Sequence, residues 1–381
     1  MKLSSSIAAP GERIALRTAD EGQRRQFVIA LRAVASILIL WHHFALYPPL
    51  REWAAPLIGG TLDWLELHAR ATQVFFVVGG YVMARSMGRK SWSLRLMCSF
   101  IVRRYFRLGI PYLVAIALAI SGYVVARGWL PDSVVGETVS FPQLLAHLFF
   151  LQDILGYEQL SAGLWFVCIN FQLSLVYALC LLLRDTVGRG KIDLVGLLGW
   201  PLAYFSLFYF GLNDTKDSWW LYFFPYFFMG IVIHRSLRGG GFRWEFGLYQ
   251  LLFVGAMVFE WRWRLLSALI VGFLLFSSES MGWGLRWPRN RAITWVGNVS
   301  YSLFLVHFPV LVFVATLWTR LNWTTPPGAV AGLFVAFGLS MLVAGLFHRW
   351  VEQPAAKFQP SWFSGRLFMT TDRKSCEITT V

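Results

Sequence analysis

Long apolar runs recur along this chain, and they constrain its fold more than any other feature of the sequence. A helix that crosses a bilayer needs roughly 20 predominantly apolar residues. Runs of about this length, bounded by charged residues or by Gly and Pro, predict ten spans. They cover residues 28–48, 71–88, 107–127, 161–184, 194–211, 218–236, 245–261, 263–279, 299–319 and 328–350. The sequence therefore predicts an all-α polytopic membrane protein with about ten transmembrane helices.

Composition and charge support this class. Hydrophobic residues make up 57% of the chain and charged residues 14%, whereas about a quarter of a soluble protein is charged. The net charge of +14 does not indicate nucleic-acid binding, because the Lys and Arg residues lie in short segments between the apolar runs. If both termini are cytoplasmic, the inner segments hold 26 of the 34 Lys and Arg residues and the outer segments hold 7. This asymmetry follows the positive-inside rule and predicts that orientation.

The predicted spans form one domain. We expect a polar cytoplasmic segment at residues 1–26, a transmembrane domain at 27–357 and a poorly ordered cytoplasmic tail at 358–381. The outer segment 128–160 contains an apolar stretch, 144–151, that is too short to span and predicts a short interfacial helix. The four cysteines show no metal-ligand spacing, so we expect neither a metal site nor a disulfide framework. They are Cys98, Cys168, Cys180 and Cys376.

The first predicted span carries a cationic or ionisable side chain near each end. Ionisable groups inside a membrane are costly and therefore suggest function. Arg32 and His43 are eleven residues apart, which places them on nearly the same helix face, roughly 16 Å apart along the axis. His42 points about 80° away, so His43 is the better candidate to share a cavity with Arg32. A neutral buried imidazole suits a general base, and the alternative is a histidine that only packs in the core.

A second cluster lies in RRYFRLGIP, where Arg103, Arg104 and Arg107 precede Pro111 at the predicted cytoplasmic start of span three. Three guanidinium groups at one membrane boundary could bind a phosphate-bearing ligand by bidentate contacts. The alternative is a positively charged anchor that contacts lipid headgroups.

Four other residues are candidates. His307, in NVSYSLFLVHFPV with Tyr301, is either catalytic or a packing histidine bonded to a tyrosine or to the backbone. Glu352, in HRWVEQP, could form an ion pair with the inner arginines, and we favour that structural role over a catalytic one. Trp165 lies near an outer end, where tryptophan either stacks on sugar rings or belongs to the interfacial belt.

Several other reaction classes lack their motifs. The sequence has no GxSxG elbow, no HExxH motif, no Walker loop and no Rossmann glycine fingerprint placed between a strand and a helix. The predicted membrane region is also poor in carboxylates, which argues against a proton-coupled transporter that uses an Asp or Glu relay.

Taken together, the motifs resemble the bacterial acyltransferase family three, multispan enzymes that O-acylate surface polysaccharides, lipopolysaccharide and related glycans. LRAVASILILWHHF is similar to the first-helix Arg-x10-His signature of the family, which selects Arg32 and His43. TQVFFVVGGYVMAR resembles its FFVLSGF stretch, and RRYFRLGIP resembles its arginine-rich motif. GNVSYSLFLVHFPV and WVEQP resemble its last two signatures. The resemblance covers about residues 27–357.

The chain departs from the family pattern at two positions. Gly79 stands where the family often has Ser, so that side chain is absent. In LWFVCINFQLSL, Asn170 occupies the position where many members carry Glu, so a carboxylate from span four is in question. No SGNH-type domain follows span ten, so we expect transfer to be completed by the membrane domain or by a separate extracytoplasmic partner.

The resemblance implies an acyl-CoA donor, most often acetyl-CoA, and a glycan or glycolipid acceptor on the outer side of a bacterial inner membrane. Arg103, Arg104, Arg107 and Arg32 would then hold the nucleotide phosphates. His43 would deprotonate a glycan hydroxyl, and a transient acyl-histidine is the rival mechanism. A second interpretation is a transporter or flippase of a lipid-linked saccharide, and a third is an acyl-CoA-regulated membrane scaffold.

Overall fold

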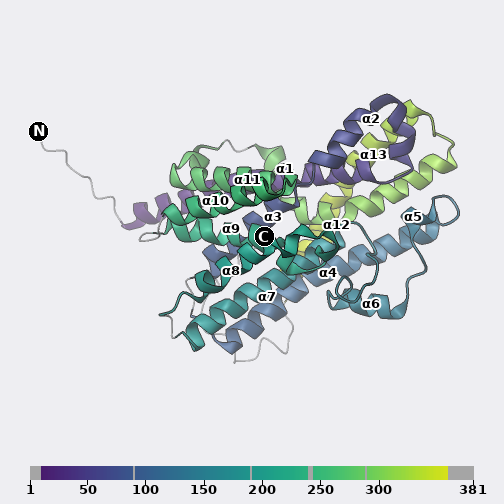
Figure 1. Ribbon diagram of the computed structural model, residues 1–381. Coiled ribbons are helices and arrows are strands. Elements are labelled where there is room, and N and C mark those ends of the chain that lie inside the picture. Colours follow the sequence, from purple (N-terminus) through teal and green to yellow (C-terminus); the bar gives the residue numbers. More distant parts are fainter. Residues whose placement is uncertain (1–9, 89–90, 189–190, 239–242, 288–289, 359–381) are drawn as a thin grey trace, which may run out of the picture.

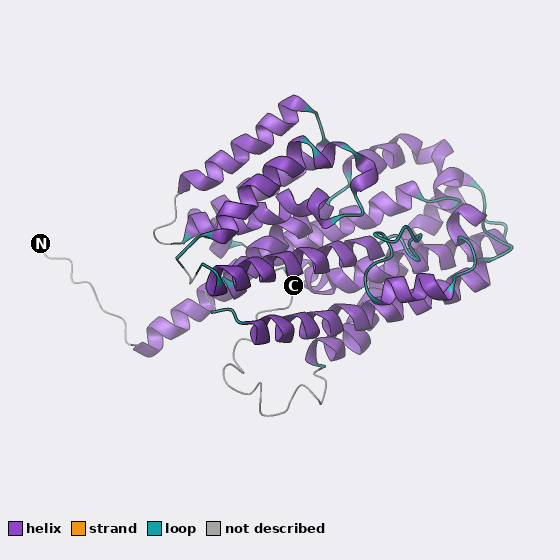
Figure 2. Cartoon of the chain, turned by 60° about the horizontal axis from the view of Figure 1, so that its bottom comes forward, coloured by secondary structure: helices purple, strands orange, loops and turns teal. Residues whose placement is uncertain are grey.

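The computed structural model describes residues 10–358 other than 89–90, 189–190, 239–242 and 288–289. Helices make up all the regular elements in this part of the chain (Figure 2). They are α1 (Pro10–Leu46), α2 (Leu50–His68), α3 (Thr72–Met87), α4 (Leu94–Ala126), α5 (Asp132–Val135), α6 (Phe141–Leu148), α7 (Leu164–Thr186), α8 (Leu194–Phe208), α9 (Trp220–Leu237), α10 (Arg243–Phe259), α11 (Trp263–Ser280), α12 (Arg291–Arg320), α13 (Pro326–Phe347) and α14 (Gln353–Lys357). A π-helical turn, His348–Glu352, joins α13 to α14.

Each of the ten predicted spans coincides with a helix, namely α1, α3, α4 and α7 to α13. Seven stretches of the described residues are long and apolar enough to cross a membrane. The predicted all-α polytopic fold is therefore confirmed, whereas the number of spans and the side of the termini stay predictions. Apart from residue 358, the predicted tail lies outside the described residues. A short helix within the outer segment is present as α6.

The structure adds to the predicted helices at two places. The helix at the arginine cluster begins at Leu94 and not at residue 107, because the Ser93 hydroxyl caps it by accepting a 3.3 Å hydrogen bond from the Leu96 N–H. The arginines therefore lie inside a long helix. Helix α2 was not predicted, since charged residues interrupt its apolar pattern. One face of α2 buries Leu50, Ala54 and Leu62, and Arg51 on α2 pairs with Asp63 at 2.9 Å.

Buried apolar side chains form two clusters. The α3/α9 core is built around α3 and α9 with α10 and α11, and the α4/α12 core is built around α4 and α12 with α2 and α13. In Figure 1, α10 and α11 lie toward one end of the molecule and α2 and α13 toward the other. Helices α1, α7 and α12 contribute residues to both clusters. These shared helices also carry Arg32, His43 and His307, three of the buried polar side chains.

Helices α3 and α9 touch through their backbones. An added Cβ on Gly80 would lie 1.9 Å from the Phe227 carbonyl oxygen, and one on Gly230 would lie 2.0 Å from that of Val77. Small residues allow such approach between helices in a membrane. At the neighbouring Gly79 the nearest atom would be 4.0 Å away, so the serine of the family pattern has room there.

Helices α1 and α12 also approach closely, and they run parallel. An added Cβ on Gly297 would lie 2.3 Å from the Ile29 carbonyl oxygen. Near the beginning of the pair Thr294 donates a 3.1 Å hydrogen bond to Gln26, and further along both helices His43 meets His307. This contact brings the predicted residues of the first span against α12.

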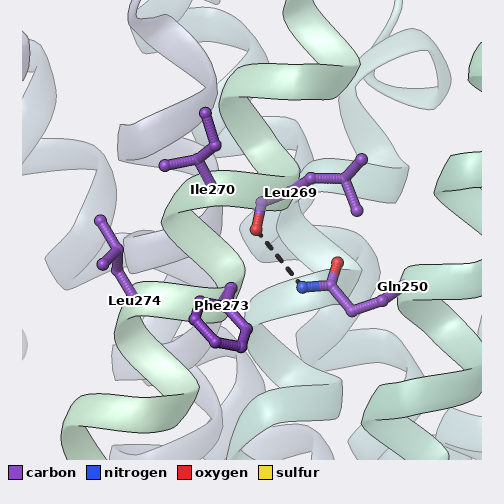
Figure 3. A pocket seen from close by; sticks show the side chains of 5 residues that line it. All are labelled: Gln250, Leu269, Ile270, Phe273 and Leu274. Carbon is purple, nitrogen blue, oxygen red and sulfur yellow. Dashed lines mark hydrogen bonds between the residues drawn. The ribbon is translucent and has the colours of Figure 1, made fainter.

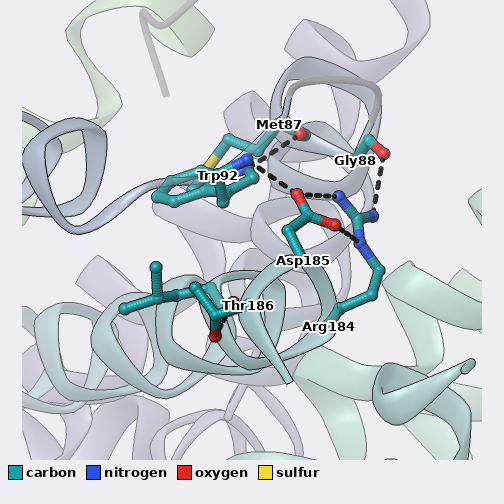
Figure 4. A network of polar contacts seen from close by, with 7 residues as sticks. Met87, Gly88, Trp92, Arg184, Asp185 and Thr186 are labelled. Atoms are coloured by element: carbon teal, nitrogen blue, oxygen red, sulfur yellow. Dashed lines mark hydrogen bonds and ion pairs between the residues drawn. The ribbon is translucent and has the colours of Figure 1, made fainter. Parts of the chain in front are cut away.

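Charged side chains tie the helix ends together. At the end of α7, Arg184 pairs with Asp185 at 2.6 Å and donates to the Gly88 carbonyl at 3.2 Å, while Asp185 accepts from the Trp92 N–H at 2.7 Å (Figure 4). Arg235 on α9 pairs with Asp193 at the start of α8, and this contact holds the pKa of that carboxyl below its usual range. The ion pairs fix the connections and leave the helix interiors to the buried site.

Candidate active site

Helix α12 carries four polar side chains that each bond to a different part of the structure. Ser300 meets Arg32 of α1, and the Tyr301 hydroxyl donates to the Leu108 carbonyl of α4 at 2.9 Å. Ser302 donates to Glu352 of the π-helical turn. His307 contacts His43 of α1. Because all four positions share one helix, their relative heights are fixed by its rise.

Arg32 is buried, with 8% of its surface exposed. One terminal nitrogen, Nη2, donates a 2.9 Å hydrogen bond to the Ser300 hydroxyl oxygen. The same hydroxyl donates to the Gly297 carbonyl, also at 2.9 Å. The charged guanidinium is thus held against α12 by a neutral hydroxyl that the preceding helical turn orients.

His43 and His307 form a buried pair. Their side chains are 7% and 1% exposed, and His43 Nδ1 lies 2.6 Å from His307 Nε2. The ring planes differ by only 5°. On its other side, His307 Nδ1 lies 3.0 Å from the Leu303 carbonyl oxygen. Arg32 and His43 both contact α12, as their spacing predicts. The His42 ring is tilted against that of His43, with ring centroids 5.3 Å apart.

The structure separates the three predicted arginines. Arg103 is exposed, whereas Arg104 and Arg107 are partly buried. Arg104 Nη2 donates a 3.2 Å hydrogen bond to the Asn170 side-chain oxygen, and its Nε is buried with no partner among the described residues. Tyr301 lies close enough to Arg104 and Arg107 to feel their charges. Arg104 and Arg107 therefore border the polar residues of α12.

Glu352 and Trp165 both contact side chains that the sequence did not predict as their neighbours. Glu352 accepts a 2.5 Å hydrogen bond from Ser302 and pairs with His348 at 2.9 Å, and its predicted ion pair with the inner arginines stays a prediction. Both ends of that pair belong to the π-helical turn, a distortion that is frequent at functional sites. Trp165 is half-buried and stacks on Phe223, with ring centroids 5.2 Å apart.

Sequence reasoning missed a buried polar network under the outer connection between α6 and α7. The Gln152 amide is fully buried and donates to the Cys168 sulfur at 2.7 Å and to Gln159 at 3.4 Å. Gln159 in turn donates to Asp153. Gln152 Oε1 and Asp153 Oδ2 are buried with no partner among the described residues. Burial raises the pKa of Asp153 to about 6. The signal was the run LQDILGYEQL, whose polar residues interrupt an apolar stretch.

The site has two ends along α12. Tyr301 marks the end near Arg104 and Arg107, and His307 lies six residues further along, which corresponds to about 9 Å of helix. The arrangement therefore combines guanidinium groups at one level with a paired imidazole at another.

Two pockets among the described residues lie apart from the candidate site. One is lined by Gln250 of α10 and by residues of α11, where Gln250 donates to the Leu269 carbonyl at 3.3 Å (Figure 3). The other lies among α7, α8 and α9. Neither includes a predicted site residue, so the passage from the inner arginines to His43 stays a prediction. Among the described residues, no group of three or more His, Cys, Asp or Glu side chains is placed to hold a metal ion.

Comparison with known proteins identifies a family. A family model described as an acyltransferase domain matches residues 25–345. Glucans biosynthesis protein C of Escherichia coli O139:H28 (strain E24377A / ETEC) is 24% identical, and that of Salmonella schwarzengrund (strain CVM19633) is 22% identical. In both cases the alignment covers 90% of this chain and 95% of the relative. No solved structure matches.

Proposed function

The chain belongs to the acyltransferase family three, and from that premise we propose that it transfers an acyl group from cytoplasmic acyl-CoA to a hydroxyl of an extracytoplasmic glycan. Acetyl is the acyl group that we favour, and a bacterial inner membrane is the location. The observation that carries the proposal is the buried pair of His43 and His307, which lies on the same two helices as the buried Arg32–Ser300 contact, since these residues lie in the matching motifs.

In this proposal Arg104 and Arg107 bind the phosphates of the donor. Guanidinium groups bind phosphate oxygens by paired, charge-assisted hydrogen bonds. Arg104 suits this role because its partner Asn170 is neutral, so no carboxylate on that residue competes for its charge. A buried Nε without a partner costs free energy that a ligand oxygen would recover. Arg103 is exposed and would contact the outer edge of the nucleotide or lipid headgroups.

The reaction begins when His43 accepts the proton of an acceptor hydroxyl. The oxygen attacks the thioester carbonyl carbon, a C–O bond forms and the C–S bond breaks. The CoA thiolate leaves and takes the proton from the His43 imidazolium, so His43 returns to its starting state. General-base catalysis of this kind contributes about 10²- to 10⁴-fold to a rate.

The acceptor assignment uses the names of the relatives and the outer polar network. The relatives are named for glucan biosynthesis, which supports a glycan acceptor for this chain. Gln152 Oε1 and Asp153 Oδ2 are hydrogen-bond acceptors without partners among the described residues, and sugar hydroxyls are donors that would satisfy them.

The test uses membrane vesicles that contain the protein. Radiolabelled acetyl-CoA is supplied on the cytoplasmic side and glucan oligosaccharides on the other, and label in the glycan is measured. We expect His43→Ala to lower transfer by about 10³-fold. His68→Ala, which removes a histidine of α2 outside the site, serves as the matched control. Full transfer by His43→Ala would overturn the assignment, and absence of labelled glycan in wild type would overturn the function.

A further inference from the structure

The hydrogen bonds of His307 determine where its proton lies. A carbonyl oxygen only accepts hydrogen bonds, so the 3.0 Å contact with the Leu303 carbonyl requires the proton of His307 on Nδ1. In a neutral imidazole the other nitrogen then carries a lone pair and accepts. A charged imidazolium at this place, with 1% of its surface exposed, would need a nearby carboxylate, and its partners here are His43 and the Leu303 carbonyl.

The same reasoning then fixes His43. His307 Nε2 accepts, so the 2.6 Å contact requires His43 Nδ1 to donate. A neutral His43 therefore carries its proton on Nδ1 and its lone pair on Nε2. The order of donation runs from His43 to His307 and from His307 to the backbone of α12.

We propose that His307 is the positioning residue of this site: it selects the Nδ1–H tautomer of His43 and so makes Nε2 the nitrogen that receives the hydroxyl proton. The catalytic part of this inference rests on the proposed acyl transfer. In the Ser-His-Asp triad, a partner that stabilises the wrong histidine tautomer lowers kcat by about 10⁴-fold, which shows how much such a contact contributes.

Two substitutions of similar size separate positioning from packing. His307→Gln places an amide at the position of Nε2, where its oxygen accepts from His43. His307→Asn places its amide near Nδ1, where it still donates to Leu303 but no longer reaches His43. We expect the Gln variant to keep kcat within about 10-fold of wild type and the Asn variant to lose about 10²- to 10⁴-fold, both with an unchanged KM for acyl-CoA. Equal losses in both variants would show that His307 only fills space.

A second measurement does not depend on activity. Nitrogen-15 NMR of histidine-labelled protein in bilayers distinguishes protonated from unprotonated ring nitrogens, and a His43→Gln sample identifies the His43 signals. We expect His43 to be protonated on Nδ1 only, and we expect His307→Leu to remove that preference. A His43 protonated on Nε2, or on both nitrogens, would overturn the inference. The expected tautomer in a protein that transfers no acyl group would retain the inference and reject the proposed function.

Discussion

Two helix pairs, α3 with α9 and α1 with α12, approach each other in the same way and differ in the side chains beside the contact. Glycine permits backbone contact in both, at Gly80 in the first pair and at Gly297 in the second. Aromatic rings border the α3–α9 contact, including Phe76 on Phe223 at 4.9 Å. Ionisable groups border the α1–α12 contact. Close approach is thus a packing device in both, and the flanking residues decide whether it also serves chemistry.

The largest effect should come from breaking the α3–α9 contact with Gly80→Ala. The new Cβ would lie 1.9 Å from a backbone oxygen, which has no rotamer to adopt, so the helices must separate. We expect a loss of about 3 kcal/mol of stability, the upper end of overpacking costs. The measurement is the thermal unfolding midpoint in mild detergent. Gly79→Ser, at a position with 4.0 Å of space, should behave as wild type, and equal stability of the two variants would contradict the comparison.

The corresponding change in the other pair, Gly297→Ala, should act on activity. Its Cβ would lie 2.3 Å from the Ile29 carbonyl, so α1 moves away from α12 and the His43–His307 contact opens. A displacement of about 1 Å can cost 10²-fold in rate, and we expect kcat to fall by about that factor. Gly247→Ala, on an exposed position of α10 with no atom within 4 Å, is the control. An unchanged kcat in a folded Gly297→Ala protein would show that the α1–α12 contact is not required for activity.

A third change leaves both glycine contacts intact and removes the guanidinium of Arg104. Hydrogen bonds to charged groups contribute about 1.5–3 kcal/mol, so Arg104→Ala should raise the KM for acyl-CoA by about 30-fold. The kcat should change little, because in the proposed mechanism Arg104 contacts neither His43 nor His307. The exposed Arg103→Ala should raise KM by less than about 3-fold, since surface charges contribute little. The reverse order of the two effects would remove Arg104 from the donor site.

The smallest effect should come from Asp153→Asn in the outer network, away from both contacts. Burial raises the pKa of Asp153 in the folded protein to about 6, above the 3.8 of a solvent-exposed Asp side chain. The folded state therefore binds more protons than the unfolded state between those values, and stability falls as pH rises through this window. We expect the Asn variant to be more stable than wild type at pH 7 by about 1 kcal/mol, allowing for solvent screening. The advantage should disappear near pH 4, which unfolding midpoints across that range will measure.

Much of the fold could be predicted because each membrane-spanning helix of a membrane protein appears as a continuous apolar run in the sequence. Helix α2 escaped because it mixes charged residues with a buried stripe, so neither the length nor the composition of a span was present. The start of α4 was not predicted because Arg is a good helix former, so the helix extends back through the arginines to its cap at Ser93.

The site was only partly predictable because its contacts join distant segments. The spacing of Arg32 and His43 fixed their common face, but nothing in the sequence states that His307 lies 2.6 Å from His43. Ser300 and Ser302 escaped because serine is ordinary in membrane helices, where it often bonds its own backbone. Arg103 and Arg104 are adjacent in the sequence and point about 100° apart around the helix, so the exposure of each side chain depends on where the neighbouring helices lie.

Through its four bonded side chains, helix α12 contacts every part of the proposed site. This one helix forms hydrogen bonds with Arg32, Leu108, Glu352 and His43. A slide or turn of α12 would shift the level of the arginines and the level of the imidazoles together. In the proposed reaction, the groups assigned to the donor and the groups assigned to the acceptor would therefore move together.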